Sequence, residues 1–260
     1  MRSALLYLLL TVSAAAQTAA PVAPQDNDNA RKARTLIEQC IAALGGPAYL
    51  GIHDMEQEGR TYGFSRQGES GTGAPFWRFW KWPDKDRIEL TKERDWVVIH
   101  TGDQGYEITF HGTQPEEKEA LQGFLERRHY SLEYVLRTWI NEPGASLFYD
   151  GVALAERKQA DQVTVLNTQN EAVTLFLDTR THLPIKKSYT RRDPKTRDKD
   201  VEEEIYDNYH PVQGIATPYD TARMHNGQQT NARFLKEVRY NVGVPDSKFD
   251  AAVTTAPAKK

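Results

Sequence analysis

The feature that most constrains the fold is a run of alternating apolar and polar residues between positions 163 and 234. In its first part, aliphatic residues recur at every second position within two segments, at Val163 and Val165 and then at Val173, Leu175 and Leu177. This alternation is typical of strands that bury one face. Further along, Asn226-Gly227 favours a two-residue hairpin, because both residues accept positive φ angles. The run therefore predicts an antiparallel meander whose apolar face must be covered by the rest of the chain.

The first sixteen residues have the pattern of a secretory signal peptide. Arg2 precedes an apolar run over residues 4–12, and Ala14-Ala15-Ala16 suits a cleavage site for small residues. The apolar run is shorter than the ~20 residues of a membrane-spanning helix, and a short hydrophobic anchor is the alternative. Cys40 is the only cysteine and lies far beyond the cleavage point, so neither a lipid anchor nor an intramolecular disulfide is expected. We therefore expect a periplasmic product, cleaved near Ala16, with residues 17–28 as a flexible leader.

The composition indicates a globular protein and excludes one class of partner. The 260 residues are 39% hydrophobic and 27% charged, enough for one large β domain or two small domains. There are 33 basic and 36 acidic residues, with a formal net charge of −3. A general nucleic-acid binder would have a strong basic excess, so none is expected.

Two segments have helical spacing. Residues 29–44 place an apolar stripe on one face, at Ala33, Leu36, Ile37, Cys40, Ile41 and Leu44. Cys40 lies on this stripe and is expected to be a core residue, because reactive thiols need an exposed electropositive setting. Residues 115–140 also have helical spacing, with a break expected near His129-Tyr130-Ser131.

The remaining pattern predicts strands and turns. Strands are expected at residues 55–64, 76–82, 87–91, 96–100, 106–110 and 234–240. Asp150-Gly151 suggests a second tight hairpin. Residues 191–204 contain 11 charged residues of both signs, which we interpret as a solvated loop or hairpin tip without chemistry. Residues 250–260 are of low complexity, and we expect a disordered tail.

The order of several short motifs resembles the outer-membrane lipoprotein-sorting family, the LolA-like periplasmic carriers. The motifs are Pro83-Asp-Lys-Asp-Arg87, Gly102-Asp-Gln-Gly105 before Tyr106, Asp178-x-x-Thr-x-Leu-Pro184 and Ile215-x-Thr-Pro218. They follow a signal peptide and an amphipathic helix, as in that family, and the similarity covers most of residues 31–249. This chain departs from the best-known carriers in its Trp-rich strand, its charged segment and its greater length.

The resemblance implies a mainly β fold with a single LolA-like domain over residues 29–249. This fold is an unclosed, strongly curved antiparallel half-barrel with helices on its concave side, and between them lies an apolar cavity for acyl chains. The implied function is binding and transport of an acylated lipoprotein or lipid towards the outer membrane, by a monomer that exchanges cargo with an envelope protein complex. The alternative within the same fold is an envelope sensor or recognition module for lipid, carbohydrate or peptide, without a carrier role.

We expect the cavity to be lined by apolar residues from the sheet and from the helical segment. The expected lining is Trp80, Trp82, Ile88, Leu90, Trp96, Val98, Ile108, Phe110, Phe124, Leu132, Val135, Leu136, Val165 and Leu175. A one-residue error in strand parity would exchange the strand residues for those of the opposite face. The same residues could instead fill a closed core, and residues 117–140 could be a lid or a permanent plug.

No catalytic motif is found, and neither a metal nor an organic cofactor is implied. None of the seven histidines is part of a His-Glu-x-x-His pattern, and the chain has no Gly-x-Ser-x-Gly elbow. An uncharacterised hydrolase is a minor alternative, since catalytic groups can converge from distant positions. A stacking platform for carbohydrate or peptide is another alternative, but parity places Trp80 and Trp82 on one face and Trp77 on the other.

Overall fold

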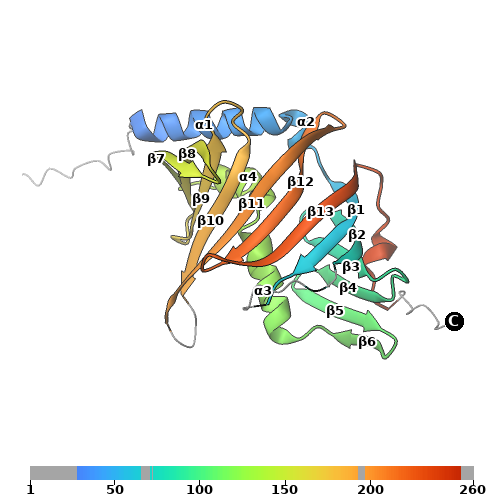
Figure 1. Cartoon of the computed structure of the whole chain (residues 1–260). Coiled ribbons are helices and arrows are strands. Elements are labelled where there is room, and N and C mark those ends of the chain that lie inside the picture. Colours follow the sequence, from blue (N-terminus) through green and yellow to red (C-terminus); the bar gives the residue numbers. More distant parts are fainter. Residues whose placement is uncertain (1–27, 66–70, 72, 193–196, 253–260) are drawn as a thin grey trace, which may run out of the picture.

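A computed structural model describes residues 28–65, 71, 73–192 and 197–252 of the chain. Within these residues, thirteen antiparallel strands form one sheet in the order β6-β5-β4-β3-β2-β1-β13-β12-β11-β10-β9-β8-β7. The strands are β1 (Asp54–Gly63), β2 (Ala74–Lys81), β3 (Lys85–Leu90), β4 (Trp96–Thr101), β5 (Gln104–Thr109), β6 (Gly112–Pro115), β7 (Ser146–Ala155), β8 (Lys158–Leu166), β9 (Ala172–Asp178), β10 (Pro184–Arg192), β11 (Lys199–Val212), β12 (Ile215–His225) and β13 (Gln228–Tyr240). Figure 1 shows the sheet curving around the helices without closing. The predicted unclosed, curved half-barrel is confirmed.

The helices α1 (Asp28–Leu44), α2 (Pro47–Leu50), α3 (Lys118–His129) and α4 (Leu132–Arg137) gather on one face of the sheet, together with the 3₁₀ turn η1 (Trp139–Asn141). A second 3₁₀ turn, η2 (Asp246–Phe249), lies on the other face. In Figure 1, α1 crosses one end of the sheet, α4 lies behind β11 and β12, and α3 extends below them towards β5. No helix in the described residues combines the length and apolar character that a membrane crossing requires.

The first helix forms as its sequence predicts. The predicted stripe is buried at Ala33, Leu36, Ile37, Cys40 and Leu44. Its residues join the main core with apolar residues of β8 and β9, such as Val163 and Leu175. The helix ends at Leu44 and is followed by Gly45, which has a φ of +127°. A Cβ at Gly45 would lie 2.6 Å from the carbonyl oxygen of Gly214, so glycine is required there for both conformation and space.

Two separate cores lie on opposite faces of the sheet. The main core lies under the helices, on the concave face. A second core lies on the other face, where the C-terminal segment packs on the strands, and consists of Phe79, Val97, Ile99, Ile108, Val244 and Phe249. Trp77 packs against this second core, whereas Trp80 packs against the first. Alternate residues of β2 therefore enter different cores, as strand parity requires.

Several local predictions are confirmed and one is wrong. The helical segment breaks at Tyr130-Ser131, and Asn226 and Gly227 have φ angles of 51° and 77° in the hairpin between β12 and β13. The hairpin predicted at Asp150-Gly151 is wrong, because β7 runs through these residues with a bulge and turns later. A bulge and a turn share the same Gly-containing signal, which explains the error.

The charged segment is not one solvated tip throughout. Residues 191 and 192 end β10, and residues 199–204 begin β11. The predicted signal peptide, almost all of the predicted leader, residues 193–196 and residues 253–260 lie outside the described part of the chain.

Candidate ligand-binding cavity

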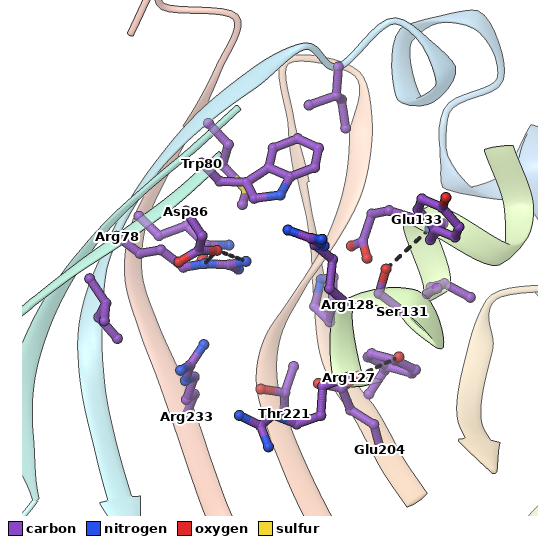
Figure 2. Close-up of a pocket in the computed structure, with 18 of the residues that line it drawn as sticks. Arg78, Trp80, Asp86, Arg127, Arg128, Ser131, Glu133, Glu204, Thr221 and Arg233 are labelled. Carbon is purple, nitrogen blue, oxygen red and sulfur yellow. Dashed lines mark hydrogen bonds and ion pairs between the residues drawn. The ribbon is translucent and has the colours of Figure 1, made fainter. Parts of the chain in front are cut away.

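A cavity of about 510 Å³ lies on the concave face of the sheet, between β1–β3, β11–β13 and the segment containing α3 and α4. Its wall is apolar around Trp80 and strongly charged around Arg233, and Figure 2 shows these two side chains at opposite ends of the view. A ligand in this cavity would therefore meet two different chemical environments.

The apolar end is built on aromatic rings fixed to one another. The ring centroids of Trp80 and Trp82 are 6.1 Å apart, and those of Trp82 and Tyr134 are 6.0 Å apart. Arg137 stacks over Trp82, 3.9 Å from the ring centroid, and its Nη1 donates a hydrogen bond of 2.8 Å to the carbonyl oxygen of Ile52. These contacts hold the indole of Trp82 between the sheet and α4.

Part of the apolar wall remains uncovered by the helices. Ile88, Leu90 and Val98 line the cavity, are only half-buried and belong to neither core. On the other side, no residue of α3 is fully buried. The helices thus leave apolar surface of the sheet accessible from within the cavity.

Helix α3 is tied to the sheet by polar contacts. His100 Nε2 lies 2.8 Å from Glu116 Oε2, and the His100 ring stacks on Phe124 with centroids 3.5 Å apart. Burial lowers the pKa of His100 and so favours the neutral ring. Arg128 donates a hydrogen bond of 2.7 Å to the carbonyl oxygen of Gly102, in the turn between β4 and β5. These contacts position the cavity-facing side of α3.

The charged end follows from strand register. Across β10, β11 and β12, Lys187 lies opposite Glu204, and Glu204 lies opposite Arg223. In the neighbouring row, Thr221 of β12 lies opposite Arg233 of β13. Side chains that face each other across a sheet interact directly, so the register gathers basic and acidic groups on the concave face.

One carboxylate at this end is well compensated. Glu204 lies 3.2 Å from the Nζ of Lys187 and 3.7 Å from the Nε of Arg223, and it accepts a 3.0 Å hydrogen bond from the Tyr206 hydroxyl. Burial alone would raise the pKa of Glu204, but Lys187 and Arg223 outweigh it and lower the pKa to about 2. Glu204 is therefore ionised at neutral pH.

A second ion pair lies between the two ends. The Nε and Nη2 of Arg78 donate to Oδ2 of Asp86 at 2.8 and 2.5 Å. Both residues line the cavity, on adjacent strands β2 and β3. This charge-assisted pair neutralises Arg78 locally.

Two other arginines of the wall have no such compensation. Within the described residues, the side chain of neither Arg127 nor Arg233 makes a hydrogen bond or an ion pair, and the Nε of Arg233 is buried without a partner. Burial, reinforced by the charge of Arg223, lowers the pKa of both, to about 9 for Arg233. Both remain cations at neutral pH.

The structure brings together half of the cavity residues expected from the sequence. Those that line the cavity are Trp80, Trp82, Ile88, Leu90, Val98, Phe124 and Leu132. Their contact with a ligand remains a prediction.

The other half lies elsewhere, for three reasons. Ile108 faces the second core, because β5 has the opposite parity to the one assumed. Trp96 and Phe110 lie at strand ends and are 45% and 65% exposed. Val135, Leu136, Val165 and Leu175 are fully buried in the main core, which the helices already fill.

Sequence reasoning missed the charged end entirely. Glu204 belongs to the run that was interpreted as solvated, and Arg223 and Arg233 lie in strands whose pairing the sequence does not specify. One sequence signal could have identified it. Glu204 and Tyr206 are two positions apart and lie on the same face of β11, and Arg233 and Leu235 do the same in β13. A charged residue that alternates with aromatic or aliphatic residues on one face is a candidate wall residue.

Among the described residues, no group of three or more His, Cys, Asp or Glu side chains is arranged to hold a metal ion. Cys40 is buried, and burial raises the pKa of its thiol, which makes it unreactive.

Comparison with known proteins shows the fold. No protein-family model and no curated protein matches the sequence. A DUF1329 family protein from Desulfovibrio piger is similar with a TM-score of 0.57 and 12% identity, covering 85% of this chain and 99% of that one. A domain from Vibrio parahaemolyticus that is assigned to outer membrane lipoprotein sorting has a TM-score of 0.57 and 11% identity. The similarity covers 86% of this chain and 99% of that domain. A LolA superfamily protein from Nitrosomonas europaea is similar with a TM-score of 0.50 and 11% identity, covering 84% of this chain and 97% of that one. The chain therefore has a LolA-like fold.

Proposed function

We propose that this protein binds an acylated ligand non-covalently in the cavity and carries it through the periplasm, towards an acceptor in the envelope. The observation that carries the proposal is the uncovered apolar wall of Ile88, Leu90 and Val98. Apolar side chains that face a cavity rather than a core are suited to contact a hydrocarbon chain. The LolA-like fold supports the proposal, since one structure of this fold is assigned to lipoprotein sorting. The periplasmic location rests on the signal-peptide pattern of residues 1–16.

The size of the cavity is sufficient for such a ligand. A volume of about 510 Å³ falls within the roughly 300–1,000 Å³ of small-molecule sites. Moving about ten methylene groups out of water would gain about 8 kcal/mol. Before the cost of association is subtracted, this corresponds to a Kd of about 1 µM. Binding of this strength would be reversible, as a carrier requires.

Native mass spectrometry of protein purified from a periplasm without detergent tests the proposal. We expect a bound lipid or acylated peptide, which solvent extraction of the same sample would identify. Val98→Trp should abolish this mass, because Val98 points from β4 into the cavity and an indole there would occupy ligand space. Val152→Trp is the matched control, since Val152 is 61% exposed on the edge strand β7.

Two results would oppose the proposal. The first is a wild-type protein with a clean mass that also takes up no fluorescent fatty acid. The second is loss of the ligand from Val98→Trp and Val152→Trp alike, which would place the binding outside the cavity. Equal melting temperatures of the variants and the wild type would show that the folds are intact.

A further inference from the structure

The cavity wall combines its apolar end with a cluster of three arginines, Arg127, Arg223 and Arg233, which we call the arginine cluster. Arg127 comes from α3, and the other two come from the adjacent strands β12 and β13. Figure 2 shows Arg127 and Arg233 reaching into the same part of the cavity, beside Thr221. The charge of Arg223 acts on both, because it contributes to the lowered pKa of each.

The other basic residues of the wall are already engaged. Arg78 is paired with Asp86, Arg128 with Gly102 and Asp103, Arg137 with Ile52 and Trp82, Lys85 with Asp246, and Lys187 with Glu204. By contrast, the side chains of Arg127 and Arg233 have neither a hydrogen bond nor an ion pair within the described residues. These two guanidinium groups therefore hold donors that the protein itself does not use.

Among the described residues, no acidic side chain nearby forms a hydrogen bond or an ion pair with either of them. Glu204 is shared between Lys187 and Arg223. Glu202 accepts from His225 at 2.7 Å. Glu133 also lines the cavity, but Figure 2 shows it on α4, across the view from Arg233. A cation held in a protein wall without an anion is unfavourable, so a feature of this kind is more readily explained by binding than by stability.

We propose that the arginine cluster binds an acidic group of the ligand, a carboxylate or a phosphate, while its hydrocarbon part lies against Trp80, Trp82 and Ile88. The inference rests on the proposed function and narrows it to anionic amphiphiles. Guanidinium groups suit this role because their planar donors match both oxyanions in a bidentate geometry. The guanidinium of Arg233 has no hydrogen-bond or ion-pair partner in the described residues and supplies such donors. The hydroxyl of Thr221, opposite Arg233 in the register, can supply another.

Two pairs of lipids that differ only in charge test the inference. Oleate is compared with oleyl alcohol, and dioleoyl phosphatidate with dioleoylglycerol, in titrations of the purified protein followed by tryptophan fluorescence. We expect the anionic member of at least one pair to bind about tenfold or more tightly than its neutral partner, as a charge-assisted hydrogen bond would require. Preference within the first pair identifies a carboxylate, and preference within the second identifies a phosphate.

Substitutions in the cluster assign the effect to these residues. Arg233→Gln and Arg127→Gln should each weaken binding of the preferred anionic lipid by about tenfold. Binding of its neutral partner should change by no more than about twofold. Arg233→Lys should retain part of the preference, because the charge remains while the fork geometry is lost. Arg239→Gln is the matched control on the same strand, since Arg239 is 59% exposed on the opposite face and is paired with Glu56. Truncating the Arg127 side chain breaks no hydrogen bond or ion pair within the described residues, so this variant should fold.

The outcomes separate this inference from the proposed function. Equal binding of charged and neutral lipids by the wild type would overturn the anionic inference and leave the acyl carrier standing. Equal weakening of both members of a pair by Arg233→Gln would also overturn it. Failure of all four lipids to bind the wild type would overturn both proposals.

Discussion

Replacing Arg233 by methionine should make the folded protein more stable. Arg233 carries its charge into the cavity wall, where its Nε is buried without an acceptor and its guanidinium lies 5.4 Å from the centroid of the Phe76 ring. Methionine has a side chain of similar length and needs no hydrogen bond. Full removal of an unpaired buried charge would be worth several kcal/mol, but water in the cavity and the contact with Phe76 reduce the gain to about 1–2 kcal/mol.

Thermal unfolding of lipid-free protein, followed by circular dichroism, measures this gain. The protein must be free of ligand, because a ligand that binds only the folded state adds its own stabilisation. For a domain of this size, 1 kcal/mol corresponds to about 2–4 °C, so we expect Tm to rise by about 2–8 °C. Arg239→Met should change the free energy of unfolding by no more than about 0.5 kcal/mol, because Arg239 forms an exposed ion pair on the other face.

A lower Tm for Arg233→Met, with an unchanged Tm for Arg239→Met, would refute the reasoning. It would mean that Arg233 stabilises the fold through a partner, so its donors would not be available to a ligand. An equal rise in both variants would trace the gain to methionine itself rather than to its position. The expected result, combined with the loss of anion binding, would show stability traded for function at one residue.

Features set by neighbouring residues were predictable from the sequence. The stripe of α1 depends on helical spacing alone, and the break before α4 has a local cause. Ser131 caps α4 by accepting a 3.2 Å hydrogen bond from the backbone nitrogen of Tyr134. The hairpin at Asn226-Gly227 likewise depends on two residues that adopt positive φ. None of these features requires knowledge of a distant segment.

Strand parity was predictable only where one face is covered. Trp80 and Trp82 were placed correctly relative to Trp77, since they belong to one short strand and its end. For β4 and β5 the alternation is ambiguous, because the C-terminal segment buries the second face with Val244 and Phe249. Ile108 is apolar for that reason, and the residues around it in the sequence do not indicate which of the two cores it enters.

The charged end of the cavity depends on pairing that the sequence does not reveal. β13 has a register shift opposite Glu58 and Gly59, where Lys236 is the extra residue. A bulge reverses the side-chain alternation beyond it. Arg233 and Arg239 are six residues apart and would share a face in a regular strand, yet only Arg233 lines the cavity. The bulge thus decides which arginine of this strand can meet a ligand.

Two further substitutions test the charge balance and the backbone of the fold. Glu204→Gln should lower the free energy of unfolding by about 2 kcal/mol at pH 7, because the pKa of Glu204 is held near 2 by Lys187 and its neighbours. The folded-state pKa is depressed, so this stabilisation is present above pH 4.5 and is lost as the pH falls towards 2. Urea titrations of both proteins at pH 7 and pH 2.5 should show the gap close, and a constant gap would contradict the ionic origin. Gly45→Ala should cost about 3 kcal/mol or more, since it combines a strained φ with a Cβ 2.6 Å from the Gly214 oxygen. Gly151→Ala is the control, because Gly151 has a φ of +104° but nothing within 4 Å of its Cβ position. It should cost only the conformational part, about 1–2 kcal/mol. The stability of both variants is measured from the midpoints of urea unfolding. Equal losses of stability would show that the close approach of Gly45 to the β11–β12 turn does not contribute to the cost.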